Sequence, residues 1–157
     1  MYRIGQGIDV HPFCDGDSVT LGGVKIPHSK SLLGHSDADV LVHAIMDAIL
    51  GAAGLPDIGF YFPPCNPKYK GASSIELLKE VVSKINGEYK IVNIDSTVLA
   101  EKPKILPHYD NMKEVIASAV GISKNCIGIK ATTTERLGFV GREEGIVAQA
   151  VVLLAKI

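Results

Sequence analysis

Three side chains in the first third of the chain have the types and spacing of a metal site. Asp9 and His11 are two positions apart, and in a β-strand such residues point to the same face. His43 lies in an apolar run of helical spacing, with Asp39 and Asp47 one turn away on either side. One carboxylate and two imidazoles form a three-ligand set with an open fourth position, as in catalytic zinc sites. From spacing alone, a hydrogen-bonded core histidine at position 43 is the competing interpretation.

A second polar cluster follows an apolar run near the C-terminus, where three threonines at positions 132–134 precede Glu135. Threonine hydroxyls and backbone N–H groups suit phosphate oxygens, and Glu135 offers Mg²⁺ a hard oxygen ligand. A threonine-rich strand that ends in an exposed acid explains the same residues, so both interpretations stay open. The loop over residues 137–142, which ends at Arg142, is either an anion-binding loop or a plain turn.

Two glycine-containing patterns have simpler explanations than a nucleotide site. Asp57 begins an Asp-Ile-Gly sequence in a Gly/Pro-rich loop over residues 55–71, where it either bonds a ribose diol or caps a turn. The turn is the commoner role of such an aspartate. Gly5 and Gly7 do not continue into G-x-G-x-x-G, because position 10 is valine. We expect these two glycines to let a strand bend or approach another backbone.

Strands must position most of these residues. Apolar patterning and turn residues predict strands or hairpins over residues 2–10, 18–27, 89–99, 127–132 and 146–154. The hairpin is expected to turn at Gly22 and Gly23, which tolerate positive φ. The last strand is apolar at alternate and intervening positions, so we expect it to be buried on both faces.

Three helices are predicted between the strands. They are expected over residues 40–50, from position 73 or 74 to about 85, and from Pro107 to Gly121. Ser36 and Asp39 have the spacing of a capping box ahead of the first helix. The order of elements predicts an α+β fold, an α/β sandwich with helices packed on one face of a sheet.

Composition limits the other function classes. The chain has 157 residues, 46% of them hydrophobic and 21% charged, and no repeat or linker, so one domain over residues 1–157 is expected. A net charge of −1 without a basic run argues against a nucleic-acid partner. The sequence shows neither the pattern of a signal peptide nor an apolar stretch of about 20 residues, so we expect no membrane partner. Three separated cysteines predict reduced thiols and a cytoplasmic location.

Four sequence blocks together resemble the 2-C-methyl-D-erythritol 2,4-cyclodiphosphate synthase family. They read GQGIDVH over residues 5–11, HSDADVLVHA over 35–44, DIG over 57–59 and ATTTERLGFVGREEG over 131–145. The resemblance runs in order from residue 3 to about residue 155. It implies a ferredoxin-like βαβ topology with a mainly four-stranded sheet. It also implies a homotrimer with three active sites at the subunit junctions.

The same resemblance implies a reaction in the non-mevalonate isoprenoid pathway. A lyase of this family closes 4-diphosphocytidyl-2-C-methyl-D-erythritol 2-phosphate to the 2,4-cyclodiphosphate and releases CMP. The family pattern assigns zinc to Asp9, His11 and His43, and a second cation, Mg²⁺ or Mn²⁺, to Glu135. Transition-state stabilisation is implied for His35 and Thr133. The implied substrate contacts are Asp9, His11, His35, Ser36, Asp57, Ile58, Gly59, Phe62, Asn66, Ala100, Lys104, Ile105, Leu106, Thr132, Thr133, Thr134, Glu135, Phe139 and Arg142.

The chain departs from the family pattern in one loop. After Phe62 and Pro63 the family usually continues with acids, as F-P-D-T-D, whereas this chain has Pro64, Cys65 and Asn66. Two carboxylates expected to face the methylerythritol part are therefore missing. The alternatives to a synthase are a metal-dependent phosphoester hydrolase, which would consume water, and a trimer that binds ligand and uses its metal for structure only.

Overall fold

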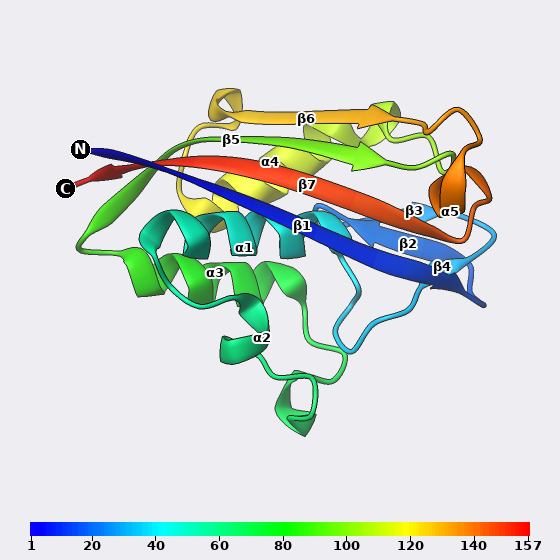
Figure 1. Cartoon of the computed structure of the whole chain (residues 1–157), viewed down its shortest axis with the longest axis horizontal. Helices are drawn as coiled ribbons and strands as arrows, with labels where there is room; N and C mark the ends of the chain where they lie inside the picture. The colour runs from blue at the N-terminus through cyan, green and yellow to red at the C-terminus, as the bar shows by residue number, and fades with distance from the viewer.

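Strand β1 (Tyr2–Cys14) is the element that carries two of the three candidate metal ligands. Its side chains alternate, so that Gly5, Gly7, Asp9 and His11 face the helices and the residues between them face outward. The computed structural model describes residues 1–157, and in Figure 1 the sheet forms one layer with α1 and α3 beneath it. The predicted common face of Asp9 and His11 is confirmed.

The sheet has five strands in the order β4-β1-β7-β5-β6. Four are long, and the fifth, β4 (Ser31–Leu32), pairs only with the end of β1. The other strands are β5 (Tyr89–Leu99), β6 (Ile127–Thr132) and β7 (Gly145–Lys156). β7 pairs antiparallel with β1 and with β5, and β5 pairs parallel with β6. The α+β class is confirmed, as a five-stranded mixed sheet.

The strand order differs from the ferredoxin-like topology that we expected. That topology contains split βαβ units, in which another strand lies between the parallel pair. One split unit is present, because β1 and β5 are both antiparallel to β7, which lies between them. β5 and β6 are instead direct neighbours joined through α4 (Tyr109–Val120), so the second unit is not split. Periodicity predicts that a segment is a strand but does not specify its neighbour, and the order had come from the resemblance alone.

Strand β7 is fully buried on one face and only partly buried on the other, which corrects in part the expectation of burial on both. Alternate residues from Ile146 to Leu154 are at most 1% exposed and pack toward the helices. On the outer face, Val147 and Ala155 near the two ends are buried, whereas Gln149 is exposed and Val151 is 41% exposed. An apolar residue at position 151 is therefore not explained by packing within the chain.

Helix α1 (Val40–Ala53) is the central helix and holds the third ligand, His43. α3 (Ser74–Ile85) packs beside it, and α4 packs against α3 and β6. These three helices confirm the predicted ones. Short turns complete the chain: α2 (Ile58–Tyr61), α5 (Gly138–Gly141), η1 (Pro67–Tyr69), η2 (Leu106–His108) and η3 (Lys124–Cys126). None of the helices is long and apolar enough to cross a membrane.

The start of α1 is capped by Asp39. The spacing had instead suggested a capping box that begins at Ser36. The Asp39 carboxylate accepts a hydrogen bond from Val42 N at 3.1 Å. It also accepts from Gly22 N at 3.0 Å and Gly23 N at 2.6 Å, at the turn between β2 (Ser18–Leu21) and β3 (Val24–Pro27). The predicted hairpin is thus confirmed, and a fully buried carboxylate ties it to the helix.

Gly5 and Gly7 allow α1 to lie directly on the backbone of β1. A Cβ atom at Gly5 would lie 1.9 Å from Ala48 O, and one at Gly7 would lie 2.1 Å from Ala44 O. Both distances are impossible for real atoms, so neither position accepts a side chain without moving the helix. The expectation that these glycines permit a close backbone approach is confirmed.

Candidate active site

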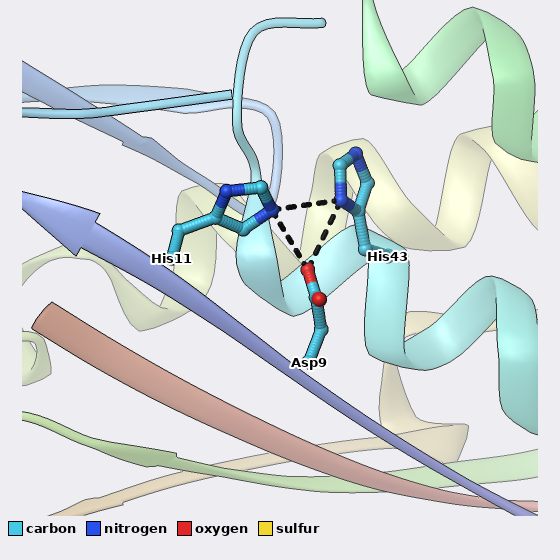
Figure 2. A group of neighbouring side chains, drawn as sticks. All are labelled: Asp9, His11 and His43. Carbon is cyan, nitrogen blue, oxygen red and sulfur yellow. Dashed lines mark hydrogen bonds and ion pairs between the residues drawn. The ribbon is translucent and has the colours of Figure 1, made fainter. Parts of the chain in front are cut away.

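Strand β1 and helix α1 bring three ligand atoms together (Figure 2). Asp9 Oδ2 lies 2.9 Å from His11 Nε2 and 3.1 Å from His43 Nδ1. The two imidazole nitrogens are 3.2 Å apart. The predicted convergence of Asp9, His11 and His43 is therefore confirmed.

The size of this triangle fits a tetrahedral metal ion. Zinc bonds of about 2.0–2.1 Å at tetrahedral angles place ligand atoms about 3.3 Å apart. The observed separations are 2.9, 3.1 and 3.2 Å, so a divalent ion fits with little movement of the side chains. All three residues also line a pocket, from which a fourth ligand can approach.

Electrostatics keep the Asp9 carboxylate ionised. Burial by itself would raise the pKa of Asp9, but hydrogen bonds and charges from His11 and His43 outweigh it and lower the pKa to about 2. Burial favours neutral His11, yet its bonds to Asp9 and to the Leu33 carbonyl leave the pKa of His11 raised. An anionic carboxylate at the centre of the site favours the binding of a divalent cation.

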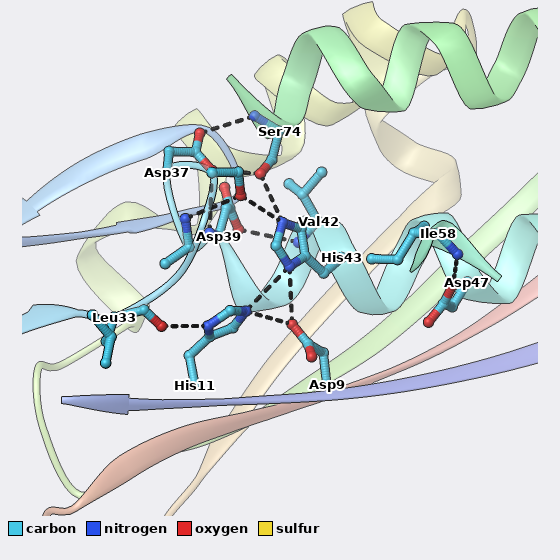
Figure 3. Close-up of polar contacts among 12 residues, drawn as sticks. Asp9, His11, Leu33, Asp37, Asp39, Val42, His43, Asp47, Ile58 and Ser74 are labelled. Carbon is cyan, nitrogen blue, oxygen red and sulfur yellow. Dashed lines mark hydrogen bonds and ion pairs between the residues drawn. The ribbon is translucent and has the colours of Figure 1, made fainter. Parts of the chain in front are cut away.

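Each imidazole also has partners on the side away from Asp9 (Figure 3). His11 Nδ1 lies 2.7 Å from the carbonyl oxygen of Leu33, to which it donates. His43 Nε2 lies 3.1 Å from Ser36 Oγ and 3.0 Å from Ser74 Oγ. Outer partners of this kind fix the orientation of a metal-binding histidine.

A pocket of about 270 Å³ adjoins the three ligands. The predicted substrate residues that line it are His35, Ser36, Ile58, Gly59 and Phe62. They come from the loop before α1 and from the segment around α2, so segments far apart in the sequence form one cavity. The three ligands and these five residues therefore lie around one pocket within a single chain.

The loop that lacks the usual acids forms one wall of this pocket. Pro64 lines the cavity where the family pattern has a carboxylate. The Asn66 side chain accepts from Lys68 N at 3.0 Å and caps η1. The backbone carbonyl oxygen of Asn66 lies 3.2 Å from His35 Nε2. Asn66 thus orients His35 and shapes the loop.

Asp57 caps α2, which confirms its expected role in a turn. Its Oδ1 accepts from Phe60 N at 3.1 Å. Asp57 and Asp47 also line a neighbouring pocket of about 260 Å³. Asp47 accepts from Ile58 N at 2.9 Å, and burial raises the pKa of its carboxyl group. Contact of Asp57 with a ribose stays a prediction.

The second group of predicted residues gathers where β5 and β6 end. The Thr133 hydroxyl lies 3.3 Å from Glu135 Oε1, to which it donates, and accepts from Glu135 N at 3.2 Å. Thr132 bonds the Thr133 carbonyl, and Thr134 bonds the Leu137 carbonyl. Glu135 has a positive φ of 54°, which is uncommon for a residue with a side chain.

The remaining predicted residues surround this second group. Ala100 donates from its backbone to the Thr132 carbonyl at 3.0 Å, and Ile105 is buried. Lys104, Leu106 and Phe139 are exposed. Arg142 is exposed and bonds Glu144 through two nitrogens, at 3.0 and 3.2 Å. None of the predicted residues from Ala100 to Arg142 lines the pocket beside Asp9.

The chain matches a family model described as the YgbB family over residues 2–155. The chain belongs to the YgbB family. A 2-C-methyl-D-erythritol 2,4-cyclodiphosphate synthase of Geobacillus thermodenitrificans is 55% identical, with coverage of 99% of this chain and 98% of the relative. A synthase of the same name from Pseudomonas putida (strain W619) is 54% identical, with coverage of 97% and 98%. The resemblance found in the sequence is therefore confirmed.

Solved structures share this YgbB-family fold. The bifunctional IspDF of Campylobacter jejuni superposes with a TM-score of 0.96 and 42% identity over 100% of this chain, which spans 43% of that longer protein. A CDP complex of IspF from Plasmodium falciparum superposes with a TM-score of 0.86 and 37% identity, covering 99% of this chain and 96% of that one.

Sequence reasoning missed several residues of this YgbB-family site. Met46 lies one helical turn after His43 and Leu77 one turn after Ser74, so helical spacing could have indicated both. Tyr69 lines the same pocket from η1. Ser74 was not among the predicted site residues, because nothing in the sequence places the start of α3 against His43.

Proposed function

We propose that this chain converts 4-diphosphocytidyl-2-C-methyl-D-erythritol 2-phosphate to 2-C-methyl-D-erythritol 2,4-cyclodiphosphate and releases CMP. The observation that carries this proposal is the 55% identity to a synthase of that name over 99% of the chain. The structure supports it with three convergent ligands beside a pocket. The reaction belongs to the non-mevalonate synthesis of isoprenoid precursors.

The reaction joins two phosphate groups of one substrate. An oxygen of the 2-phosphate forms a bond to the β-phosphorus, and the bond from that phosphorus to the bridging oxygen of CMP breaks. CMP leaves with that oxygen and with both bonding electrons. The two reacting groups are anionic at neutral pH, so charge neutralisation and in-line placement matter more than a general base.

Asp9, His11 and His43 would hold zinc, a Lewis acid that polarises a phosphate oxygen when bound. Glu135 would hold Mg²⁺ or Mn²⁺ beside the diphosphate, and its hydrogen bond with Thr133 keeps the carboxylate in place. We assign stabilisation of the transition state to His35 and Thr133. These residues act by position and charge, in agreement with the demands of the reaction.

The substrate contacts divide between the two groups of residues. The first group binds the phosphorylated polyol and the ribose, through Asp9, His11, His35, Ser36, Asp57, Ile58, Gly59, Phe62 and Asn66. The second group binds the cytidine and the diphosphate, through Ala100, Lys104, Ile105, Leu106, Thr132, Thr133, Thr134, Glu135, Phe139 and Arg142. A relative described as a CDP complex supports a pocket for a cytidine diphosphate ester.

A homotrimer would bring the two groups together. The outer face of β1 carries exposed apolar residues: Tyr2 at 70%, Ile4 at 73%, Ile8 at 58% and Val10 at 47%. Val151 of β7 extends this surface. Exposed apolar surface of this extent is typical of subunit contacts. We place the contact of three copies here, with each active site shared between neighbours.

A metal-dependent phosphoester hydrolase is not favoured, because relatives over the full length are named as synthases. We also expect no nucleic-acid partner, in view of the net charge of −1. A cytoplasmic location stays a prediction.

The decisive experiment is turnover of the cytidylyl substrate with Zn²⁺ and Mg²⁺ in ¹⁸O-labelled water, followed by phosphorus NMR and mass spectrometry. A cyclase yields CMP and cyclic diphosphate in equal amounts, with no solvent oxygen in either product. Inorganic phosphate, or a linear product that carries ¹⁸O, would instead establish a hydrolase. Asp9→Ala is the control for contaminating activity.

A further inference from the structure

A buried hydroxyl links the outer nitrogen of His43 to a carboxylate. Ser74 has no exposed surface and lies at the first position of α3. Its Oγ is 3.0 Å from His43 Nε2 and bonds Asp37 Oδ1 on its other side (Figure 3). The three residues therefore form a chain from the loop before α1, through α3, to a candidate metal ligand.

Asp37 decides the direction of the hydrogen bonds in this chain. Its Oδ2 accepts from Ser74 N at 3.0 Å, and its Oδ1 accepts from Asp39 N at 3.2 Å and from the Ser74 hydroxyl. A carboxylate only accepts. Ser74 has a single hydroxyl proton, and that proton is used in the bond to Asp37.

The Ser74 oxygen can therefore only accept from His43. The imidazole therefore carries a proton on Nε2, and Nδ1, which lies 3.1 Å from Asp9 Oδ2, is the nitrogen that is left to bind the metal. We propose that Asp37 and Ser74 are positioning residues that hold His43 in the tautomer that binds the metal. This inference rests on the proposed metal site and adds two residues to it.

The neighbouring contacts do not replace this link. Ser36 Oγ also lies 3.1 Å from His43 Nε2, but its hydroxyl proton is not bound to a carboxylate, so it can donate or accept. His11 is fixed differently, because the Leu33 carbonyl accepts from its Nδ1 and leaves Nε2 for the metal. Of the two histidine ligands, only His43 relies on side chains, and not on the backbone, to determine which ring nitrogen faces the metal.

Asp37→Asn is the sharpest test, because it changes no atom in contact with His43. An amide offers one oxygen to three donors. When that oxygen faces Ser74 N, the amide nitrogen donates to Ser74 Oγ, and the freed hydroxyl proton can bond His43 Nε2. We expect part of the population to lose the Nε2 proton, and zinc to bind about 10- to 100-fold more weakly.

Two measurements read this effect without turnover. Nitrogen-15 NMR of histidine-labelled protein reports whether Nε2 carries a proton, whatever the state of Nδ1. Competition with a chelator gives the zinc dissociation constant. The matched control for Asp37→Asn is Asp110→Asn, an exposed residue with no side-chain hydrogen bond. We expect the control to keep the wild-type spectrum and affinity.

Ser74→Ala is the second variant and serves if Asp37→Asn folds poorly. Its control is Ser73→Ala, the exposed adjacent serine whose side chain makes no capping bond. Weaker zinc binding with an altered Nε2 signal supports the proposal. A fully protonated Nε2 in both variants overturns it, whether or not zinc affinity falls. Loss of the Nε2 proton in a protein that fails to cyclise the substrate would refute the proposed function and leave this inference intact.

Discussion

Glu101 Oε1 accepts a hydrogen bond from the backbone N–H of Thr134 at 3.2 Å, although the two residues are 33 positions apart. The same oxygen accepts from Arg136 N at 3.1 Å. Between these two donors lies Glu135, and both Glu135 and Arg136 have positive φ, at 54° and 63°. Non-glycine residues in this region cost about 1–3 kcal/mol each and need support from their surroundings. Glu101 supplies that support at the proposed Mg²⁺ ligand.

Replacing Glu101 by alanine should therefore impair the reaction. We expect kcat to fall about tenfold, because two backbone bonds that hold Glu135 are lost. Glu101→Gln is the matched control, since its amide oxygen can accept both bonds. Steady-state kinetics of the two variants would check this. Their thermal stability should be equal, so that a lower kcat does not reflect unfolding. Equal kcat in the alanine and glutamine variants would contradict it.

His43→Ala should remove the bound zinc and the activity while the fold stays largely intact. Two remaining ligands do not make a stable zinc site. Metal content by mass spectrometry and the circular dichroism spectrum test both parts. Full activity in a metal-free His43→Ala protein would exclude the metal role.

Glu135 and Lys104 should separate in kinetics. Glu135→Gln is expected to lower kcat at least about tenfold and to change the Mg²⁺ dependence, since even partners of metal ligands have effects of that size. Lys104→Ala should mainly raise KM, by about tenfold, through loss of one charged contact to the nucleotide. Mg²⁺ titrations of the initial rate distinguish the two. An unchanged Mg²⁺ dependence in Glu135→Gln would count against its assignment.

Cys65→Ser should change turnover by no more than about twofold, as is usual for an exposed side chain without a defined partner. Cys65 is exposed and lies where the family pattern has a threonine between two acids. The measurement is kcat/KM for the two proteins under reducing conditions. A large loss would show that the thiol has a role of its own.

Subunit mixing tests the shared site. Asp9→Ala and Glu135→Ala chains should each be inactive alone, yet regain activity when co-expressed. In a closed ring of three, every mixed trimer has one junction at which both contributing halves are wild type. Native mass spectrometry of differently tagged chains identifies the mixed trimers. Purified mixed trimers without activity would place each site within one chain.

Features that depend on the local pattern of side chains along the chain were predictable from the sequence. Asp9 and His11 share a face because strand side chains alternate, and Gly121 ends α4 in the left-handed conformation that favours glycine. The same local rules misplaced the cap of α1, because Ser36 and Asp39 both have capping side chains. The choice was settled by Gly22 and its neighbour, whose N–H groups also require the Asp39 carboxylate.

Features that depend on packing between distant segments were not predictable. Ser74 reaches His43 across 31 positions only because α3 lies beside α1. The outer face of β7 was predicted only in part, because apolar composition does not show whether a neighbouring segment covers a side chain. Val151 is apolar and yet 41% exposed.

The contact of Gly5 and Gly7 with α1 sets the dimensions of the metal centre from a distance. The strand carries two ligands and the helix carries the third, so the gap between the two backbones determines the separation of the ligand atoms. A single methyl group at either glycine would act as a wedge and widen the ligand triangle without touching a ligand. The loop of Pro64 and Cys65 takes no part in the contact between β1 and α1. Its composition can therefore vary while the geometry of the metal centre stays fixed.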